Sequence, residues 1–330
     1  MVNVCVVGYG AVGPVHASAI VNCKYTNLYA VCDIDEEKLN TCSNLYGCKT
    51  YQDYDTLLQE SSVHSVHICT PHYLHKEMAV KALRAGKNVV LEKPVAVNEK
   101  ELDELLRVAE NSDKKICVML QNRTNNCVTK MYDILNNDSS TGKLVGLIGN
   151  LNWKRDESYY NNGNWRGKWD TEGGGLLINQ ALHLVDLMQY FGGPVKNMKS
   201  DIKRWKIENI EVEDTASALF EFENGAMGIF NATNCYITDE PYYLELKFEH
   251  RHLRYADGFL YDILEDGCNI LAKDEKMKIG KSYWGCGHNT VINNFYCSLC
   301  GNEISYPTLS DAVNAMRTIY RFYDETMSCE

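Results

Sequence analysis

The sequence predicts an α/β protein: an N-terminal doubly wound parallel sheet followed by an α+β domain with a large, mostly antiparallel open sheet. In the first third, short apolar runs alternate with stretches of helical spacing, which is typical of parallel strands joined by helices. After about residue 121, long alternating runs such as "SALFEFENGAMGIFNAT" predict antiparallel strands, and "ENG" predicts a hairpin turn. We therefore expect domains at residues 1–121 and 122–330.

The elements follow in order along the chain. Short apolar runs predict strands at Val4–Val7, Leu28–Cys32, Val66–Cys69, Val89–Leu91 and Ile116–Leu120. Helical spacing predicts helices between several of these strands, at Ala11–Asn22, Glu36–Tyr46, His75–Ala85 and Glu101–Glu110. In the second domain it predicts helices at Cys127–Leu135, Leu176–Phe191 and Ser310–Thr326. Gly47 and Gly86 lie where two of the first-domain helices should end.

The composition limits the partners and the compartment. The chain has 330 residues and a formal net charge of −11 at pH 7, which argues against nucleic acid or an anionic membrane as the main partner. Neither a secretory signal segment nor a stretch apolar enough to span a bilayer is visible. We therefore expect a cytoplasmic protein.

The chain contains 14 cysteines. Most lie inside apolar runs such as "NVCVV" and "VHICT", where a reduced cysteine behaves as a small hydrophobic residue. The alternative is a zinc site, whose ligands would be Cys286, His288, Cys297 and Cys300. The pair in "CSLC" lies in an apolar helical stretch, however, and no second CxxC occurs. We therefore expect reduced structural thiols and no metal.

The segment "GYGAVG" follows the first predicted strand and opens the first helix. In a G-x-G-x-x-G turn the first glycine permits the tight bend, the second lets the backbone approach a pyrophosphate, and the third lets helix pack on strand. The amides at the start of the helix would then hold the phosphates. This predicts a Rossmann dinucleotide site formed by Gly8, Gly10, Ala11, Val12 and Gly13, the alternative being a glycine-rich turn without a ligand.

Asp33 ends the second predicted strand, 20 residues beyond Gly13. A carboxylate at this position would accept hydrogen bonds from the adenosine ribose hydroxyls. It would also repel a 2′-phosphate, and "DIDEEK" offers no adjacent arginine. The sequence therefore favours NAD over NADP as the cofactor.

Several further motifs are more specific. They are "TPHYLH" and "AGKNVVLEKP" within residues 69–96, "QNR" at 121–123, "WRGKW" at 165–169, "GGGLLINQALHLVD" at 173–186 and "GCGH" at 285–288. With the glycine turn, they make the chain resemble the Gfo/Idh/MocA family of NAD(P)-dependent oxidoreductases. The resemblance covers essentially the whole chain, but only loosely in the last third. The sub-pattern GGG-x-L-x-NQ-x-x-H resembles sugar and sugar-nucleotide 3-dehydrogenases.

The resemblance implies roles for individual residues. Lys93 of "EKP" would lie beside the nicotinamide, followed by Pro94 in a turn that a cis bond shapes in family members. Glu92 would orient the cofactor or the lysine. Residues that would also meet the cofactor are Thr70, Pro71, His75, Gln121, Trp165 and Arg166. A solvated Lys93 and a core Trp165 are the alternatives.

"NQALH" places Asn179 and His183 four residues apart, which predicts that both lie on one face of a helix. His183 would remove the proton of an alcohol, and a cationic Lys93 would stabilise the developing alkoxide. Many family members carry aspartate where this chain has Asn179. This chain therefore departs from the usual lysine–aspartate–histidine set.

We therefore expect an NAD-dependent dehydrogenase that acts on a ring secondary alcohol of a pyranose sugar, glycoside, sugar nucleotide or cyclitol. The alternatives are an NAD-dependent glycosidase acting through transient C3 oxidation and a non-catalytic dinucleotide-sensing regulator. Retention of Lys93 and His183 argues against the sensor. Besides these two and Asn179, candidate substrate residues are Arg123, Trp153, Arg155, Tyr159, Tyr236 and His288. The resemblance also implies a homodimer or homotetramer formed through the second-domain sheet.

Overall fold

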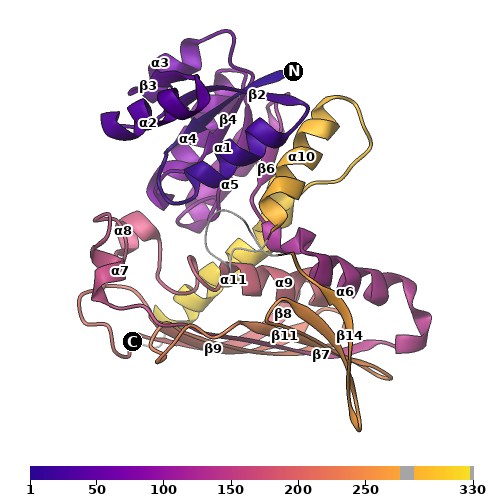
Figure 1. Cartoon of the computed structure of the whole chain (residues 1–330). Coiled ribbons are helices and arrows are strands. Elements are labelled where there is room, and N and C mark those ends of the chain that lie inside the picture. Colours follow the sequence, from indigo (N-terminus) through magenta and orange to yellow (C-terminus); the bar gives the residue numbers. More distant parts are fainter. Residues whose placement is uncertain (276–285, 328–330) are drawn as a thin grey trace. The chain divides into compact units, whose positions relative to one another are not determined.

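The computed structural model describes residues 1–275 and 286–327, and the chain divides into two compact units (Figure 1). Unit 1 comprises Met1–Gln121 and Met277–Ala312, and unit 2 comprises Asn122–Lys276 and Val313–Glu330. The division after Gln121 coincides with the boundary expected from the sequence. The sequence predicts one continuous second domain at 122–330. In the structure, however, Met277–Ala312 belongs to unit 1.

Unit 1 is built on a six-stranded parallel sheet, and its doubly wound architecture confirms the predicted fold class. The strands are β1 (Val2–Val7), β2 (Thr26–Cys32), β3 (Lys49–Tyr51), β4 (Ser65–Ile68), β5 (Asn88–Leu91) and β6 (Ile116–Val118), in the order β3-β2-β1-β4-β5-β6. The strand order reverses direction at β1. The carboxyl ends of β1 and β4 therefore flank the position where ligands bind in open α/β sheets.

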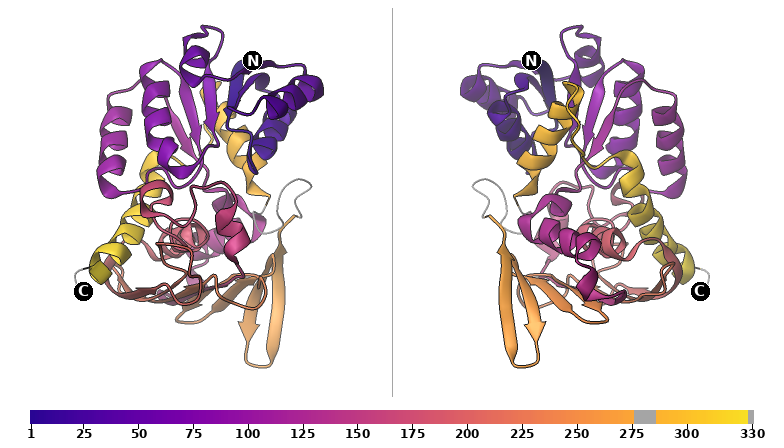
Figure 2. Two further views of the ribbon diagram at one scale, coloured as in Figure 1. Left: turned by 90° about the vertical axis from the view of Figure 1, so that its left-hand side faces the viewer. Right: turned by 90° about the vertical axis from the view of Figure 1, so that its right-hand side faces the viewer.

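Helices cover the two faces of this sheet (Figure 2). They are α1 (Gly13–Asn22), α2 (Glu36–Tyr46), α3 (Tyr54–Gln59), α4 (His72–Arg84), α5 (Glu99–Glu110) and α10 (Gly287–Leu299). Asp35, Asp53 and Asn98 accept backbone N–H bonds at the starts of α2, α3 and α5. Phe295 and Tyr296 of α10 are buried in the same hydrophobic cluster as Ile20 of α1, which explains why α10 belongs to unit 1.

Unit 2 contains an eight-stranded sheet. Its strands are β7 (Leu144–Asn152), β8 (Val195–Lys203), β9 (Thr215–Phe222), β10 (Met227–Thr233), β11 (Tyr243–Phe248), β12 (His252–Ala256), β13 (Phe259–Leu264) and β14 (Gly267–Lys273). The order is β14-β13-β12-β11-β7-β10-β9-β8, and the pairs are antiparallel except for β7 with β10. The predicted hairpin around "ENG" joins β9 to β10, with Gly225 at φ +87°.

The helices of unit 2 are α6 (Asn126–Asn137), α7 (Glu157–Asn161), α8 (Trp169–Glu172) and α9 (Leu182–Gly192). Short 3₁₀ helices lie at Gln121–Thr124 and Ser139–Thr141, and α11 (Leu309–Met327) contains the boundary between the units. The predicted helix at Leu176–Phe191 is wrong at its start, because α9 begins only at Leu182. The carboxylate of Glu213 accepts the N–H groups of Gly175 and Leu177. These bonds hold the residues directly before α9 in turns instead of a helix.

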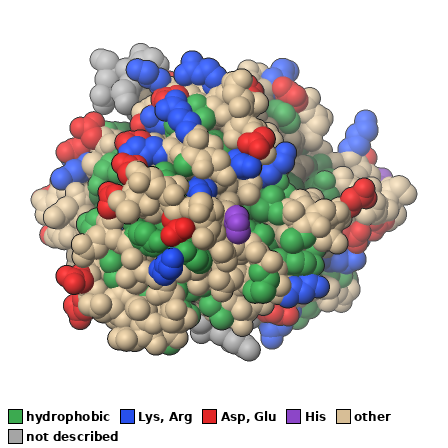
Figure 3. All heavy atoms as spheres, turned by 90° about the horizontal axis from the view of Figure 1, so that it is seen from above, with side chains coloured by type: hydrophobic (Ala, Val, Ile, Leu, Met, Phe, Trp, Pro, Cys, Tyr) green, Lys and Arg blue, Asp and Glu red, His purple; other side chains and the backbone are tan. Residues whose placement is uncertain are grey.

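Among the described residues, no helix combines the length and the apolar character needed to cross a membrane. On the face drawn in Figure 3, lysine and arginine side chains are interspersed with aspartate and glutamate. The charged side chains drawn on that face form no continuous area of one sign.

Candidate functional site

The glycine turn of unit 1 connects β1 to α1. Gly8 has φ +87°, and a Cβ there would lie 2.7 Å from the carbonyl oxygen of Cys69. A Cβ on Gly13 would lie 2.7 Å from the carbonyl oxygen of Gly8. Both positions therefore require glycine. A Cβ on Gly10 would meet no atom within 4 Å, so the backbone is open at the position where a pyrophosphate would approach.

Asp33 follows β2 and contacts this turn directly. Its Oδ2 accepts the backbone N–H of Tyr9 at 2.6 Å, and its Oδ1 accepts the N–H of Asp35 at 2.9 Å. An ionised carboxylate has about four acceptor positions. Asp33 can therefore hold the glycine turn in place and still accept hydrogen bonds from ribose hydroxyls. These groups fit an NAD molecule whose adenosine end lies beside β2.

Glu92 directly follows β5 and is buried in unit 1. Its Oε1 lies 2.9 Å from Nε2 of His16 and 3.7 Å from Nε2 of His288. Burial alone would raise the pKa of Glu92, but hydrogen bonds and the charges of His16 and His288 hold it well below its usual range. Glu92 is therefore an anion next to Lys93, whose backbone N–H donates to Oε2 at 3.3 Å.

A row of buried polar groups continues from His16 into the sheet. Nδ1 of His16 lies 2.8 Å from Nδ1 of His67, and Nε2 of His67 lies 2.8 Å from the hydroxyl of Tyr296. The 2.9 Å separation of His16 and Glu92 is a hydrogen-bond length, shorter than the about 3.3 Å expected between two ligands of one zinc ion. A hydrogen bond therefore explains the contact between His16 and Glu92, whereas His288 lies 3.7 Å from the same carboxylate as a longer ion-pair partner. The sequence pattern does not single out His16 and His67, because both lie inside apolar runs.

His75 of α4 links two segments of the same sheet edge. Its Nδ1 lies 2.6 Å from the carbonyl oxygen of Pro94, and its Nε2 lies 2.8 Å from that of Thr70. The Lys93–Pro94 peptide bond is cis, as in the turn that the resemblance implied. Burial lowers the pKa of His75, while the two carbonyl contacts act in the opposite direction. Thr70, Pro71 and the turn at Lys93 are therefore fastened to one another at the carboxyl ends of β4 and β5.

In unit 2, a buried carboxylate holds Asn179. Glu172, the last residue of α8, accepts the backbone N–H of Gly167 at 2.5 Å and Nδ2 of Asn179 at 2.6 Å. Asn179 Nδ2 also lies 3.3 Å from the hydroxyl of Tyr159. Asn179 precedes α9, whereas His183 lies in its first turn, so the two do not share a helical face as predicted. Glu172 was missed, although its position directly before "GGG" could have indicated it.

Aromatic and arginine side chains surround Tyr159. The guanidinium of Arg166 lies over the rings of Tyr159 (4.9 Å to the centroid) and Trp165 (4.6 Å). Arg155 lies over the rings of Tyr159 (5.3 Å) and Trp153 (4.8 Å). Arg155 also pairs with Asp239 at 2.8 Å. The expected residues Trp153, Arg155, Trp165 and Arg166 therefore form one stacked group within unit 2.

Three other expected substrate residues have different surroundings. Arg123 forms a two-pronged ion pair with the buried carboxylate of Asp186, at 2.7 and 3.0 Å, and this pairing indicates a structural role. His288 does not lie in the second domain, because α10 belongs to unit 1 and His288 is buried beside Glu92. Tyr236 is partly exposed, and its backbone N–H donates to the carbonyl of Trp153. Gln121, which was expected to meet the cofactor, is buried at the end of the first segment of unit 1.

The described residues also argue against a zinc site in "CGH…CSLC". His288 and Cys297 are nine residues apart in α10, which corresponds to about 13 Å along the helix axis. The thiol of Cys297 lies 3.2 Å from the hydroxyl of Tyr25, whereas His288 faces Glu92. One metal ion could not bind both side chains.

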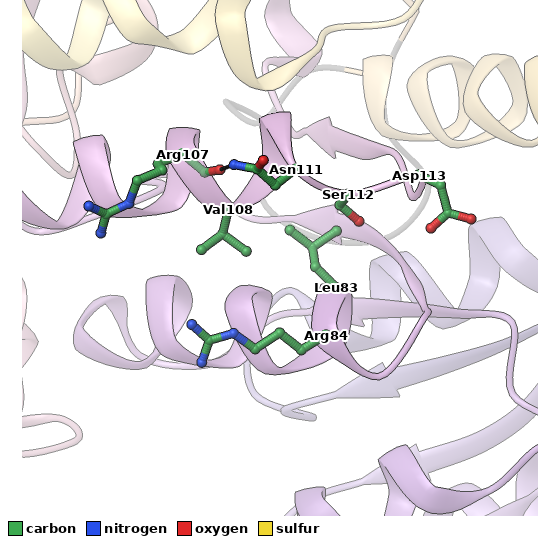
Figure 4. Close-up of a pocket in the computed structure, with 7 residues that line it drawn as sticks. All are labelled: Leu83, Arg84, Arg107, Val108, Asn111, Ser112 and Asp113. Carbon is green, nitrogen blue, oxygen red and sulfur yellow. Dashed lines mark hydrogen bonds between the residues drawn. The ribbon is translucent and has the colours of Figure 1, made fainter.

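A surface hollow of about 490 Å³ lies between α4 and α5 of unit 1 (Figure 4). It is lined by Leu83, Arg84, Arg107, Val108, Asn111, Ser112 and Asp113. These residues lie towards the carboxyl ends of the two helices, and the glycine turn, Glu92 and Lys93 do not line the hollow. It is separate from the groups described above.

Comparison with known proteins identifies both halves of the chain. Residues 2–120 match the oxidoreductase family with an NAD-binding Rossmann fold, and residues 134–253 match the GFO/IDH/MocA C-terminal domain. Glucose-6-phosphate 3-dehydrogenase of Bacillus subtilis is 20% identical over 343 aligned residues, covering 98% of this chain and 96% of the relative. Myo-inositol 2-dehydrogenase of Thermotoga maritima is 24% identical over 231 residues, covering 68% and 66%.

Among solved structures, the WlbA dehydrogenase of Bordetella pertussis in complex with NADH and UDP-GlcNAcA has the same fold. It matches with a TM-score of 0.84 and 22% identity, covering 98% of this chain and 97% of that one. The two domain matches together span more than half of the sequence. The chain therefore belongs to the Gfo/Idh/MocA family and is an NAD-binding oxidoreductase.

Proposed function

We propose that this protein oxidises a ring secondary alcohol of a pyranose sugar, glycoside, sugar nucleotide or cyclitol, or catalyses the reverse reduction. One observation carries the proposal. Lys93 follows β5 and the glycine turn follows β1, so both lie at the carboxyl edge of one parallel sheet. A dinucleotide-binding turn and a lysine on the same edge suit hydride transfer from an alcohol. The relatives named for glucose-6-phosphate and myo-inositol support this substrate class.

The chemistry needs three groups from the chain besides the hydride acceptor that NAD supplies. We assign His183 to remove the hydroxyl proton, because a neutral imidazole is a competent base near neutral pH. Lys93 stabilises the alkoxide by its positive charge. Asn179 orients the substrate by hydrogen bonding to a neighbouring hydroxyl. Trp165 and Arg166 are assigned to the cofactor, and Trp153, Arg155 and Tyr236 to the substrate.

The experiment is a substrate panel. The purified protein is incubated with NAD and individual pyranoses, glycosides, sugar nucleotides and cyclitols, and the absorbance of NADH is followed. We expect at least one compound of these classes to give NADH, and Lys93→Ala to abolish most of the rate. Tight NAD binding without turnover of any compound would instead support a dinucleotide sensor. Sugar release without net NADH would support a glycosidase.

We further propose a homo-oligomer, formed through the outer face of the unit 2 sheet. Leu219 of β9 pairs with Ile229 of β10, and both are exposed, at 52% and 51%. Ile148 of β7 also pairs with Ile229. Met227 is two residues before Ile229 on β10, so it lies on the same face of the sheet, and it is exposed. A contiguous apolar group on an open sheet face favours association with another surface. A second copy of this chain offers the same surface.

A cytoplasmic location is proposed from the thiols. The cysteines in the described part of the chain are thiols rather than disulfides, and Cys268 and Cys300 are exposed. Exposed thiols persist in reducing compartments.

A further inference from the structure

Glu172 has a specific arrangement of hydrogen bonds around its buried carboxylate. The residue is 0% exposed, and its two oxygens face different donors. Oε2 accepts the backbone N–H of Gly167, and Oε1 accepts Nδ2 of Asn179. All three residues belong to unit 2. The proposed mechanism does not otherwise use Glu172.

These bonds fix which end of the Asn179 amide faces Glu172. The N–H of Gly167 can only donate, and an ionised carboxylate can only accept. Asn179 must therefore turn its NH₂ group towards Glu172. Tyr159 is compatible with this orientation, because its hydroxyl oxygen, 3.3 Å from Nδ2 of Asn179 and 2.8 Å from Nε2 of Gln180, can accept from both. The carbonyl oxygen Oδ1 of Asn179 then points away from Glu172.

We propose that Glu172 is a positioning residue that makes Asn179 a hydrogen-bond acceptor for a substrate hydroxyl next to the one that His183 deprotonates. This inference rests on the proposed function, because it concerns the group that Asn179 presents to the substrate. An amide can present either a donor or an acceptor, whereas a carboxylate presents only acceptors. An ionised Glu172 removes this ambiguity, so a neutral side chain at position 179 acts as an acceptor without carrying charge.

The surroundings of Glu172 make this orientation sensitive to pH. Burial raises the pKa of Glu172 to about 7, against the hydrogen bonds of Gly167 and Asn179 and the positive charge of Arg166. Glu213 acts in the same direction as burial. The phenols that face Glu172 are Tyr159, Tyr160 and Tyr323, whose own pKa values are raised mainly by burial. A protonated Glu172 would donate to Asn179 and favour the inverted amide.

Two substitutions exchange the donor and the acceptor. In Glu172→Gln, the carbonyl oxygen of the new glutamine must face the N–H of Gly167. The NH₂ group of the glutamine then faces Asn179, whose amide must turn its carbonyl oxygen towards position 172. In Asn179→Asp two carboxylates meet at the distance of one hydrogen bond and must share a proton. The double variant Glu172→Gln/Asn179→Asp restores a matched pair, because the new amide at position 172 then donates to a carboxylate that presents its second oxygen outward.

The test is kcat and KM against pH for the native protein, both single variants and the double variant. We expect each single variant to lose roughly 10- to 100-fold in kcat/KM at neutral pH, as for one hydrogen bond to a charged group. The double variant should recover to within about tenfold of the native value. Glu157→Gln, at an exposed glutamate of α7, is the matched control and should change little. If the losses in the double variant are additive, Glu172 does not act through Asn179.

A second measurement uses the native chain and needs no turnover. The side-chain NH₂ of Asn179 is followed by NMR in protein labelled with ¹⁵N-asparagine, assigned by its absence in Asn179→Asp. We expect its shift to titrate near neutral pH and the titration to vanish in Glu172→Gln. An Asn179 NH₂ shift at neutral pH that is the same in Glu172→Gln as in the native protein would overturn the inference, whatever the activity. A titrating amide in a protein that oxidises no sugar or cyclitol would instead remove the proposed function.

Discussion

The backbone N–H of Tyr9 donates to Oδ2 of Asp33 at 2.6 Å, which ties the glycine turn after β1 to the end of β2. The same carboxylate is the group expected to hold the adenosine ribose. Asp33 shapes the turn and is expected to contact the cofactor, so substitution by alanine would remove both contributions together. Substitution by asparagine separates them.

Asp33→Asn keeps an acceptor for Tyr9 but removes the charge. We expect it to weaken NAD binding by about 10-fold or more, as for loss of charge from one or two hydrogen bonds, and to bind NADP better than the native protein. Asp33→Ala should weaken both dinucleotides further. Binding is measured by titrating each dinucleotide against protein fluorescence. An unchanged preference for NAD in Asp33→Asn would mean that Asp33 does not face the ribose.

Lys93→Ala should leave NAD affinity nearly intact and lower kcat by a factor on the order of 10²–10³, as for loss of one group that stabilises an oxyanion. The positive charge also contributes to lowering the pKa of His75 and of His288, for which burial is the larger cause. Lys100→Ala, at an exposed lysine of α5, is the control. Near-normal turnover in Lys93→Ala would exclude this lysine from the reaction.

Glu213 should make unit 2 less stable as pH rises. Burial raises its pKa from 4.5 to about 7, so the native state holds a proton that the unfolded chain releases between these values. Stability is then lost as pH increases from about 5 to about 8, by about 3 kcal/mol for this one group. In Glu213→Gln, the free energy of unfolding relative to the native protein should therefore rise across this interval.

The prediction for Glu213 is checked by urea unfolding of the native protein and of Glu213→Gln from about pH 5 to about pH 8. The comparison must be between variants, because His67, His75 and His288 have pKa values lowered by burial and favour the folded state as pH rises. Glu223→Gln, at an exposed glutamate, should show no such trend. A constant difference between Glu213→Gln and the native protein would contradict the prediction.

Ile229→Lys should dissociate the proposed oligomer, because it places a charge within the apolar outer face of the unit 2 sheet. Ile237→Lys is a suitable control, since Ile237 is 77% exposed and lies outside the strands. Molar mass is measured by light scattering after gel filtration. If the native protein is a monomer, or Ile229→Lys has the native mass, the oligomer does not form through this face.

Much of the parallel sheet could be predicted because its signals are local. Val4–Val7 and Val89–Leu91 are apolar runs that end in a glycine turn or a polar segment, and β1 and β5 extend them by only one or two residues. The helix at Glu36–Tyr46 was predicted at its observed bounds because Gly47 ends it in the left-handed region. The strand Lys49–Tyr51 was missed, since three mostly exposed residues carry no period.

The errors at the site arise from long-range contacts. The residues from Leu176 carry apolar side chains at helical spacing, which predicts a helix. The N–H groups of Gly175 and Leu177 instead donate to the carboxylate of Glu213, far along the chain. Likewise, nothing in "GCGH" indicates that His288 faces Glu92 across unit 1. Nor does "NQALH" indicate that Asn179 contacts Glu172, beside which the new carboxylate of Asn179→Asp would have to share a proton.

The most direct test of the central claim follows the hydrogen itself. A substrate identified by the panel is deuterated at the ring carbon that bears the hydroxyl, and the nicotinamide product is analysed by mass spectrometry. Direct hydride transfer predicts that the NADH formed carries the deuterium and that the sugar becomes the ketone. NADH without deuterium, or a sugar released with its deuterium retained or exchanged and no ketone formed, would contradict the proposal that this protein is a ring-alcohol dehydrogenase.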